Sequence, residues 1–423
     1  MRKAINETGS WRSFRHRNFR ILFPANTLSN VGSWAQRVAQ DWLVLELTNN
    51  SGTALGLVTA VQFAPVLLFS LHGGALADRV NKRKLLIGTN IVSGLTSLTL
   101  GLLVVNERIE LWHVFACAAI LGIAGAIDAP IRQAFTSELV GQSDVGNAVS
   151  LNSANFNAGR LVGPAMSGFL IARFNTGPSF IINSFTYVFV IAALLAMREK
   201  DFFIHKMEET LGTVREGIRY TLARPDLYAV MMLVFFAATF GLNFQIFNAL
   251  MATEVFDKGA ASFGLLGTFI AVGSLSGALL SARLNKKRSA RFIIKLGMIF
   301  SLVVIVLSLA PTFFWYSAWL PFCGLAALTM LVSANSYVQT HSDPAVRGRV
   351  MGIYLLIFMG GSPFGSLLIG YSAENFGVRQ TVAGCGGISL IAAASIWLFF
   401  NKKVTPPSDL RVSSVIPVID TLG

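Results

Sequence analysis

The sequence is short of charge. Asp, Glu, Lys and Arg make up only 13% of its 423 residues, about half the share found in an ordinary soluble domain. Apolar residues make up 53%, and the mean hydropathy is +0.61, so much of the surface must face something other than water. The composition therefore excludes an ordinary soluble fold and indicates an all-α integral membrane protein.

Signatures of several chemistries are also missing. Cys117, Cys323 and Cys385 lie singly inside apolar runs, and the five histidines are scattered, so we expect neither a disulfide framework nor a metal site. The chain lacks GxSxG, HExxH and P-loop motifs and has no sizeable polar domain, which argues against an enzyme, ATP hydrolysis or a bound cofactor. Nothing resembles a selectivity filter or a ring of like charges, which disfavours a channel.

Apolar runs of about 20 residues, long enough to cross a bilayer as a helix, recur twelve times. The expected spans are 20–46, 53–76, 84–105, 111–133, 145–172, 177–197, 226–252, 260–282, 291–310, 313–338, 350–373 and 380–400. The first run is full-length and has no small-residue cleavage site, so a cleaved signal peptide is not expected.

Basic residues are divided unequally between the two sides of these spans. One side, which includes both termini, carries 28 of the 34 Lys and Arg, and the other carries 4. The positive-inside rule places both termini in the cytoplasm of a cell-membrane protein. The net charge of +13 is then explained by topology and anionic headgroups, without nucleic acid.

Similar stretches recur about 200 residues apart. GALADRVNKRK from Gly74 is similar to GALLSARLNKKR from Gly277, VGNAVSLN from Val145 to RGRVMGIY from Arg347, and GPAMSGFLI from Gly163 to SPFGSLLIG from Ser362. This repeat predicts two pseudo-symmetric six-helix bundles with a substrate site at the bilayer midplane. The expected parts are a cytoplasmic arm (1–19), a first bundle (20–197), an amphipathic linker (198–225), a second bundle (226–400) and a tail (401–423).

Two of these motifs resemble the major facilitator superfamily, in its drug-efflux-like branch that includes bacterial enterobactin exporters. Gly74 to Lys84 is similar to the superfamily's G-x-L-a-D-r-x-G-r-k-x signature, with Asn81, which also tolerates a left-handed turn, at the second Gly. Gly159 to Gly168 is similar to the antiporter motif G-x-x-x-G-P-x-x-G-G. The resemblance implies the twelve-helix fold and efflux. Ala119 stands where proton-coupled relatives carry a buried Arg, so the resemblance does not extend to proton coupling.

The signature loop acts as a cytoplasmic gate in that superfamily. The residues expected to form such a gate here are Gly74, Asp78, Arg79, Lys82, Arg83, Asp128, Arg132, Arg347 and Arg349. Positive-inside placement alone is an alternative explanation for the basic ones. Arg349 and Arg347 could pair with Glu138 or Asp144. The motif in span 5, with Gly159, Gly163, Pro164 and Gly168, either supports efflux or serves simple helix packing.

Charges inside spans are costly and mark functional sites. On span 1, Trp34, Arg37 and Asp41 share one helical face. Arg37 and Asp41 could form a structural pair, or Asp41 could be protonated during coupling. Our candidates for substrate binding or coupling are Arg37, Gln40, Asp41, Gln62, Asn155, Arg160, Asn243, Gln245, Asn248 and Asn335. About half of the amides should instead join helices.

The leading hypothesis is a monomeric secondary transporter that exports small apolar or amphipathic molecules, with protons as a candidate coupling ion. The alternatives are an importer of a small nutrient and a membrane sensor that transports nothing.

Overall fold

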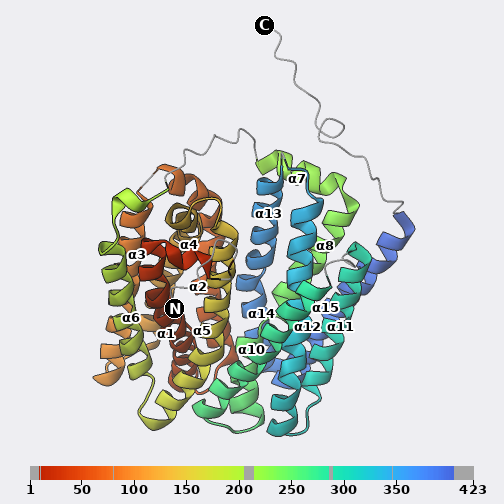
Figure 1. Ribbon diagram of the computed structural model, residues 1–423. Helices are drawn as coiled ribbons and strands as arrows, with labels where there is room; N and C mark the ends of the chain where they lie inside the picture. The colour runs from red at the N-terminus through yellow and green to blue at the C-terminus, as the bar shows by residue number, and fades with distance from the viewer. Residues whose placement is uncertain are drawn as a thin grey trace. The chain divides into compact units, whose positions relative to one another are not determined.

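The computed structural model describes residues 9, 11–79, 81–203, 214–284, 289–344 and 346–403, and for residues 66, 68–79, 214, 282 and 401–403 only their backbone. Most of the described residues are helical, and none of them forms a strand. They fall into two compact units (Figure 1). Residues 1–208 and 248–271 belong to unit 1, and residues 209–247 and 272–423 belong to unit 2.

Unit 1 contains a short 3₁₀ helix, η2 (Arg12–Arg15), and six long helices. These are α1 (Arg17–Leu47), α2 (Gly52–Arg79), α3 (Lys82–Val105), α4 (Leu111–Val140), α5 (Val145–Arg173) and α6 (Gly177–Leu195), followed by η3 (Glu199–Asp201). Unit 1 also includes the π-helical segment η5 (Met251–Val255) and the first half of α10 (Ala260–Arg283).

In unit 2 the first described helix is the amphipathic α7 (Val214–Ala223), which lies inside the range 198–225. Its seventh and eleventh spans are interrupted. The seventh consists of α8 (Pro225–Phe236), the π-helical segment η4 (Ala237–Gly241) and α9 (Phe244–Leu250), which continues into unit 1. The eleventh consists of α13 (Arg347–Gly360) and α14 (Ser362–Phe376). The remaining helices are α11 (Ala290–Ser308), α12 (Phe313–His341) and α15 (Val378–Lys403).

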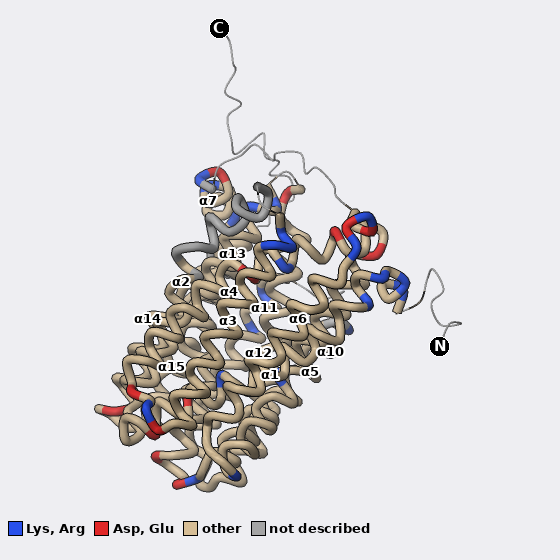
Figure 2. Tube along the Cα trace, turned by 90° about the vertical axis from the view of Figure 1, so that its left-hand side faces the viewer, with Lys and Arg blue, Asp and Glu red and all other residues tan. Residues whose placement is uncertain are grey.

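Nine segments of the described chain are long and apolar enough to cross a bilayer as transmembrane helices. The other three predicted spans, in α1, α2 and α5, are also helical. Charged residues gather mostly near helix ends, so the midsections are largely tan (Figure 2). Together with the family evidence below, these segments show a multi-pass membrane protein.

The same pairs of spans pack closely in both units. In unit 1, α3 packs on α6 and α1 on α5. In unit 2, their counterparts α11 and α15 pack together, as do η4 and α14. Glycines permit the close approach: a Cβ on Gly101 would lie 2.5 Å from Ile181 of α6, and one on Gly386 of α15 would lie 2.7 Å from Ile305 of α11.

Local sequence explains several helix ends. Asn81 has φ −66° and accepts a hydrogen bond from the Lys84 backbone N–H at 3.1 Å, so it caps α3 and does not adopt the left-handed turn that we expected. Gly141, with φ +70°, ends α4. The break between α13 and α14 falls at Gly361, two residues before Pro363, which has no N–H to donate.

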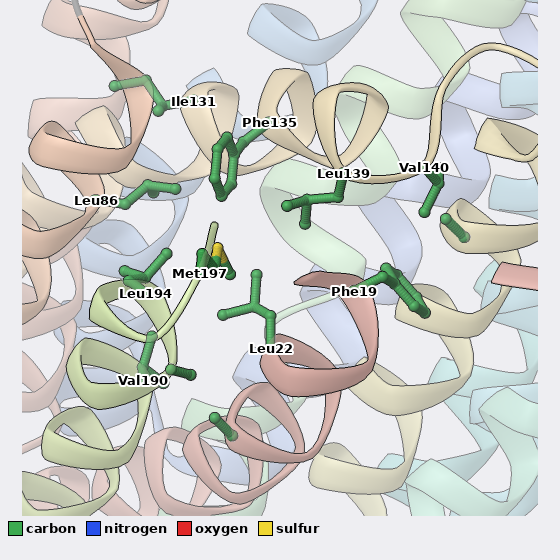
Figure 3. Packing of buried hydrophobic residues seen from close by; sticks show 13 residues of the cluster. Phe19, Leu22, Leu86, Ile131, Phe135, Leu139, Val140, Val190, Leu194 and Met197 are labelled. Carbon is green, nitrogen blue, oxygen red and sulfur yellow. The ribbon is translucent and has the colours of Figure 1, made fainter. Parts of the chain in front are cut away.

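An apolar cluster fills the end of unit 1 where α1 begins (Figure 3). Phe19 and Leu22 of α1 meet Phe135 and Leu139 of α4 and Leu194 of α6, all less than 5% exposed. Phe135 and Leu194 are separated by 59 residues in sequence, so the cluster joins distant segments. Cys117, Cys323 and Cys385 are buried free thiols.

Candidate functional site

Unit 1 encloses a polar cavity of about 210 Å³, large enough for several water molecules. It is lined by polar side chains from α1, α2, α3, α4 and α6. These are Ser33, Gln36, Arg37, Gln40, Gln62, Asn90, Ser93, Asp128, Asn183 and Tyr187, together with Leu121 and Gly125. Of the ten candidates for substrate binding or coupling, the cavity brings Arg37, Gln40 and Gln62 together.

Amides fix one wall of the polar cavity. Gln36 Oε1 accepts hydrogen bonds from Ser97 Oγ at 2.7 Å and from Asn183 Nδ2 at 2.6 Å. Gln40 Nε2 donates to Gln62 Oε1 at 3.2 Å. These bonds join α1 to α3, α6 and α2, so the four amides link helices of unit 1. Of the four, Gln40 and Gln62 are among our candidates.

Asp128, which lines the cavity, forms an ion pair with Arg132 of the same helix. Arg132 Nε and Nη2 donate to the two carboxylate oxygens of Asp128 at 2.7 and 2.9 Å, a bidentate arrangement. Thr89 Oγ1 donates to Asp128 Oδ1 at 2.8 Å, and Arg132 Nη1 donates to Asn26 Oδ1 at 2.8 Å. This pair therefore ties α4 to α3 and α1.

Arg37 and Arg160 meet at one aromatic ring. The guanidinium carbons of Arg37 and Arg160 lie 5.0 and 5.7 Å from the ring centroid of Trp34, within cation–π range. Arg37 also lies 5.8 Å from the Phe63 ring. One helical turn beyond Arg37, Asp41 is 4% exposed. Arg37 interacts electrostatically with Asp41, but the two do not form an ion pair within 4.0 Å among the described residues.

The other predicted binding amides have different surroundings. Asn155 is 4% exposed, and its Oδ1 has no hydrogen-bond partner in the described chain. Asn243 Nδ2 donates to the Thr239 carbonyl oxygen of its own span at 2.8 Å. Asn248 is buried in unit 1, whereas Gln245 and Asn335 belong to unit 2.

The motif of span 5 packs against two helices of unit 1. A Cβ on Gly163 would lie 2.6 Å from Trp34 Cβ, and one on Gly159 would lie 2.8 Å from the Asn30 backbone. On the other side, a Cβ on Gly168 would lie 2.8 Å from the Ala260 carbonyl oxygen, and one on Gly267 would lie 2.8 Å from Pro164. The small residues thus place α5 between α1 and the first half of α10.

Two of the predicted gate residues, Lys82 and Arg83, have partners within unit 1. Lys82 Nζ pairs with Glu138 at 2.8 Å, and Arg83 donates to the carbonyl oxygens of Leu194 and Leu195 and pairs with Glu199. The side chains of Gly74, Asp78 and Arg79 lie outside the described residues.

Arg349 of α13 forms an ion pair with Glu216 of α7 at 2.8 Å. Gly217 of α7 lies against Arg349, because a Cβ on this glycine would be 3.0 Å from Arg349 Cβ. Glu138 and Asp144, the partners that we expected, are engaged by Lys82 and by the N-terminal arm. Arg347 Nε is buried and has no hydrogen-bond partner among the described atoms.

Asp144 fastens the N-terminal arm to the loop before α5. Its carboxylate pairs with Arg12 at 3.2 Å, Arg15 at 2.9 Å and His16 at 2.7 Å, although its side chain is only 3% exposed. Burial opposes ionisation, but the hydrogen bond from His16 and the charges of Arg15 and Arg12 together lower the pKa of Asp144.

Sequence reasoning missed six polar residues of the cavity. They are Ser33, Gln36, Asn90, Ser93, Asn183 and Tyr187. Asn183 is the one amide side chain of α6, a helix that is mostly apolar, and this was the available signal.

The chain is a multi-pass helical protein with a charged, amide-lined cavity inside one of its bundles. These features are typical of membrane transporters. The chain belongs to the transmembrane secretion effector family of the major facilitator superfamily, whose model matches residues 8–418.

Curated relatives cover most of the chain. It is 26% identical to the staphyloferrin A transporter of Staphylococcus aureus (91% of this chain, 96% of the relative). It is 25% identical to the multidrug efflux pump Tap of Mycolicibacterium fortuitum (85% and 90%) and 22% identical to the enterobactin exporter EntS of Shigella flexneri (84% and 85%).

Among solved structures, a bacterial homologue of the lysosomal transporter Spinster, in an inward-facing and unoccupied conformation, matches with a TM-score of 0.74 and 17% identity (92% of this chain, 99% of the other). The predicted superfamily and fold are thereby confirmed.

Proposed function

We propose that this transporter exports small amphipathic molecules across the cytoplasmic membrane by alternating access. Both termini would face the cytoplasm, and the protein would act as a monomer. The names of the relatives support export, since two of them are an enterobactin exporter and a multidrug efflux pump. The distribution of basic residues supports the orientation.

The observation that carries the proposal is the group of ionisable and amide side chains around Arg37 and Asp41 inside unit 1. Charges at this depth are retained when they serve a pathway. We assign substrate contact to Trp34, Arg37 and Arg160, and proton coupling to Asp41. Protonation of Asp41 would change the balance of charge beside Arg37 and so bias the conformational equilibrium.

Transport in inverted membrane vesicles tests the direction. Uptake of the exported compound into inside-out vesicles, driven by an imposed pH gradient, is expected. Accumulation only in right-side-out vesicles would support the importer alternative, and no counterflow in proteoliposomes would support a sensor.

Asp41→Asn tests the coupling. We expect it to abolish gradient-driven transport while the protein remains folded. Glu46→Gln is the matched control, because Glu46 lies on the same helix, is exposed and only accepts a hydrogen bond from Trp42. Unchanged transport by Asp41→Asn would remove Asp41 from the proposal.

A further inference from the structure

Trp34 lies at the meeting point of two cations from different helices. Arg37 of α1 and Arg160 of α5 both approach its ring. Phe156 packs edge-on against the same ring, with centroids 5.5 Å apart, and Phe63 lies beside Arg37. The site therefore combines two planar guanidinium groups with an aromatic wall.

Among the described side chains, the positive charge of this site exceeds its negative charge. Neither Arg37 nor Arg160 belongs to an ion pair within 4.0 Å in the described chain, and Asp41 is the acid that acts on Arg37. The two arginines repel each other electrostatically. By contrast, Arg132 is matched by the carboxylate of Asp128 through two hydrogen bonds. Within the described part of the chain, one acid faces two cations, and this leaves one positive charge in a region where an unneutralised charge is costly.

Guanidinium groups bind planar oxyanions through parallel N–H···O hydrogen bonds, and aromatic rings bind the apolar part of the same molecule. We propose that Arg37 and Arg160 bind the carboxylate of an amphipathic substrate, whose apolar part packs on Trp34, Phe63 and Phe156. The inference rests on the proposed function and narrows its substrate class to anions. A carboxylate would neutralise the surplus charge, and the polar cavity next to Arg37 offers room for further polar groups.

Binding of 2-naphthoate, compared with its neutral isostere 2-naphthamide, tests the charge requirement. With purified protein in lipid nanodiscs, we expect saturable binding of naphthoate and weaker binding of naphthamide. Arg37→Gln and Arg160→Gln should each weaken naphthoate binding about 10- to 100-fold and leave naphthamide unchanged. Arg173→Gln, which removes an exposed cation from the same helix as Arg160, should change neither.

Thermal unfolding of the same variants separates a binding role from a structural one. A cation kept for a ligand should not stabilise the empty protein, so Arg160→Gln should leave its Tm unchanged or raise it because the repulsion is relieved. Three results would overturn the inference. They are equal affinity for naphthoate and naphthamide, no saturable binding of naphthoate, and naphthoate binding that neither arginine substitution changes.

Vesicle transport then distinguishes this inference from the proposed function. If neutral compounds are exported and the Arg37 and Arg160 variants export them normally, the proposed export function is supported and the proposed carboxylate site is wrong. If naphthoate binding depends on the two arginines but no compound is transported, the carboxylate site is supported and the proposed export function is wrong.

Discussion

The two units bury different kinds of polar group. Unit 1 buries amides and carboxylates, among them Gln36, Gln40, Asp41 and Asn183. In unit 2, the buried polar side chains of the described residues are Ser and Thr hydroxyls and four tyrosines. A hydroxyl can donate to the carbonyl four residues earlier, as Ser301 does to Gly297, and needs no second helix. Amides and charges need partners when they are buried, so in the described residues the buried groups that require such partners lie mostly in unit 1.

The units also differ in helix continuity. The six long helices of unit 1 are each continuous, whereas in unit 2 two spans are interrupted, at η4 and at Gly361. These interruptions meet, because Gly361 and Gly365 lie against Thr239 of η4. In the described residues, both units have polar links between helices, such as Gln36 to Asn183 and Tyr337 to Asp226, so what sets unit 2 apart is that two interrupted spans pack against each other.

The largest expected effect comes from Arg132→Gln. It would leave the carboxylate of Asp128 without its cation, at a cost of about 2 to 3 kcal/mol for this partly buried pair, measured as a lower unfolding midpoint in detergent. The double variant with Asp128→Asn should recover most of the loss. If the single variant unfolds like the native protein, the polar links of unit 1 do not stabilise it.

A smaller effect should follow from Gln36→Met, which leaves the donors of Ser97 and Asn183 without their acceptor. We expect a loss of about 1 to 2 kcal/mol in the free energy of unfolding. Ser301→Ala in unit 2 is the comparison, and its effect should be close to zero because the hydroxyl returns to its own helix. Equal losses at both sites would break the contrast between the units.

The smallest effect concerns the surface of each unit. Asp144→Asn should loosen the N-terminal arm by about 1 kcal/mol and speed tryptic cleavage at Arg12 and Arg15 about fivefold. Glu216→Gln should loosen α7 less, because Glu216 is 37% exposed and Asp144 only 3%. If trypsin cleaves the arm equally fast in the native protein and in Asp144→Asn, the ion pairs of Asp144 do not hold the arm in place.

The arm contact also has a defined pH dependence. Because folding lowers the pKa of Asp144 from its ordinary value of 3.8, its stabilisation is fully present above that value and is lost as the pH falls through the lowered pKa. Cleavage of the native arm by an acid protease should therefore increase below pH 3.8, whereas Asp144→Asn should show little change there.

Much of the helical order could be predicted from apolar runs alone. The predicted spans 84–105 and 260–282 differ from α3 and α10 by one or two residues at an end. The breaks in spans 7 and 11 were missed, because hydrophobicity does not report the backbone hydrogen-bonding pattern. The sequence Gly360-Gly361-Ser362-Pro363 carried a signal for one of them.

The site was predictable where its residues share one helix. Arg37 and Asp41 could be placed on one face because their spacing follows the helical repeat. The bond from Asn183 to Gln36 spans 147 residues, and its existence depends on how α6 packs on α1. Periodicity within a single helix contains no such information.

The three buried thiols have a practical consequence. Cys323 is fully buried, and Cys117 and Cys385 are 7% and 5% exposed, so maleimide reagents should react slowly with the native chain. A cysteine introduced at one position would then be the principal target for a spectroscopic label. Movements of the arm, of α7 or of Trp34's neighbours could be followed in a protein that retains all of its native residues elsewhere.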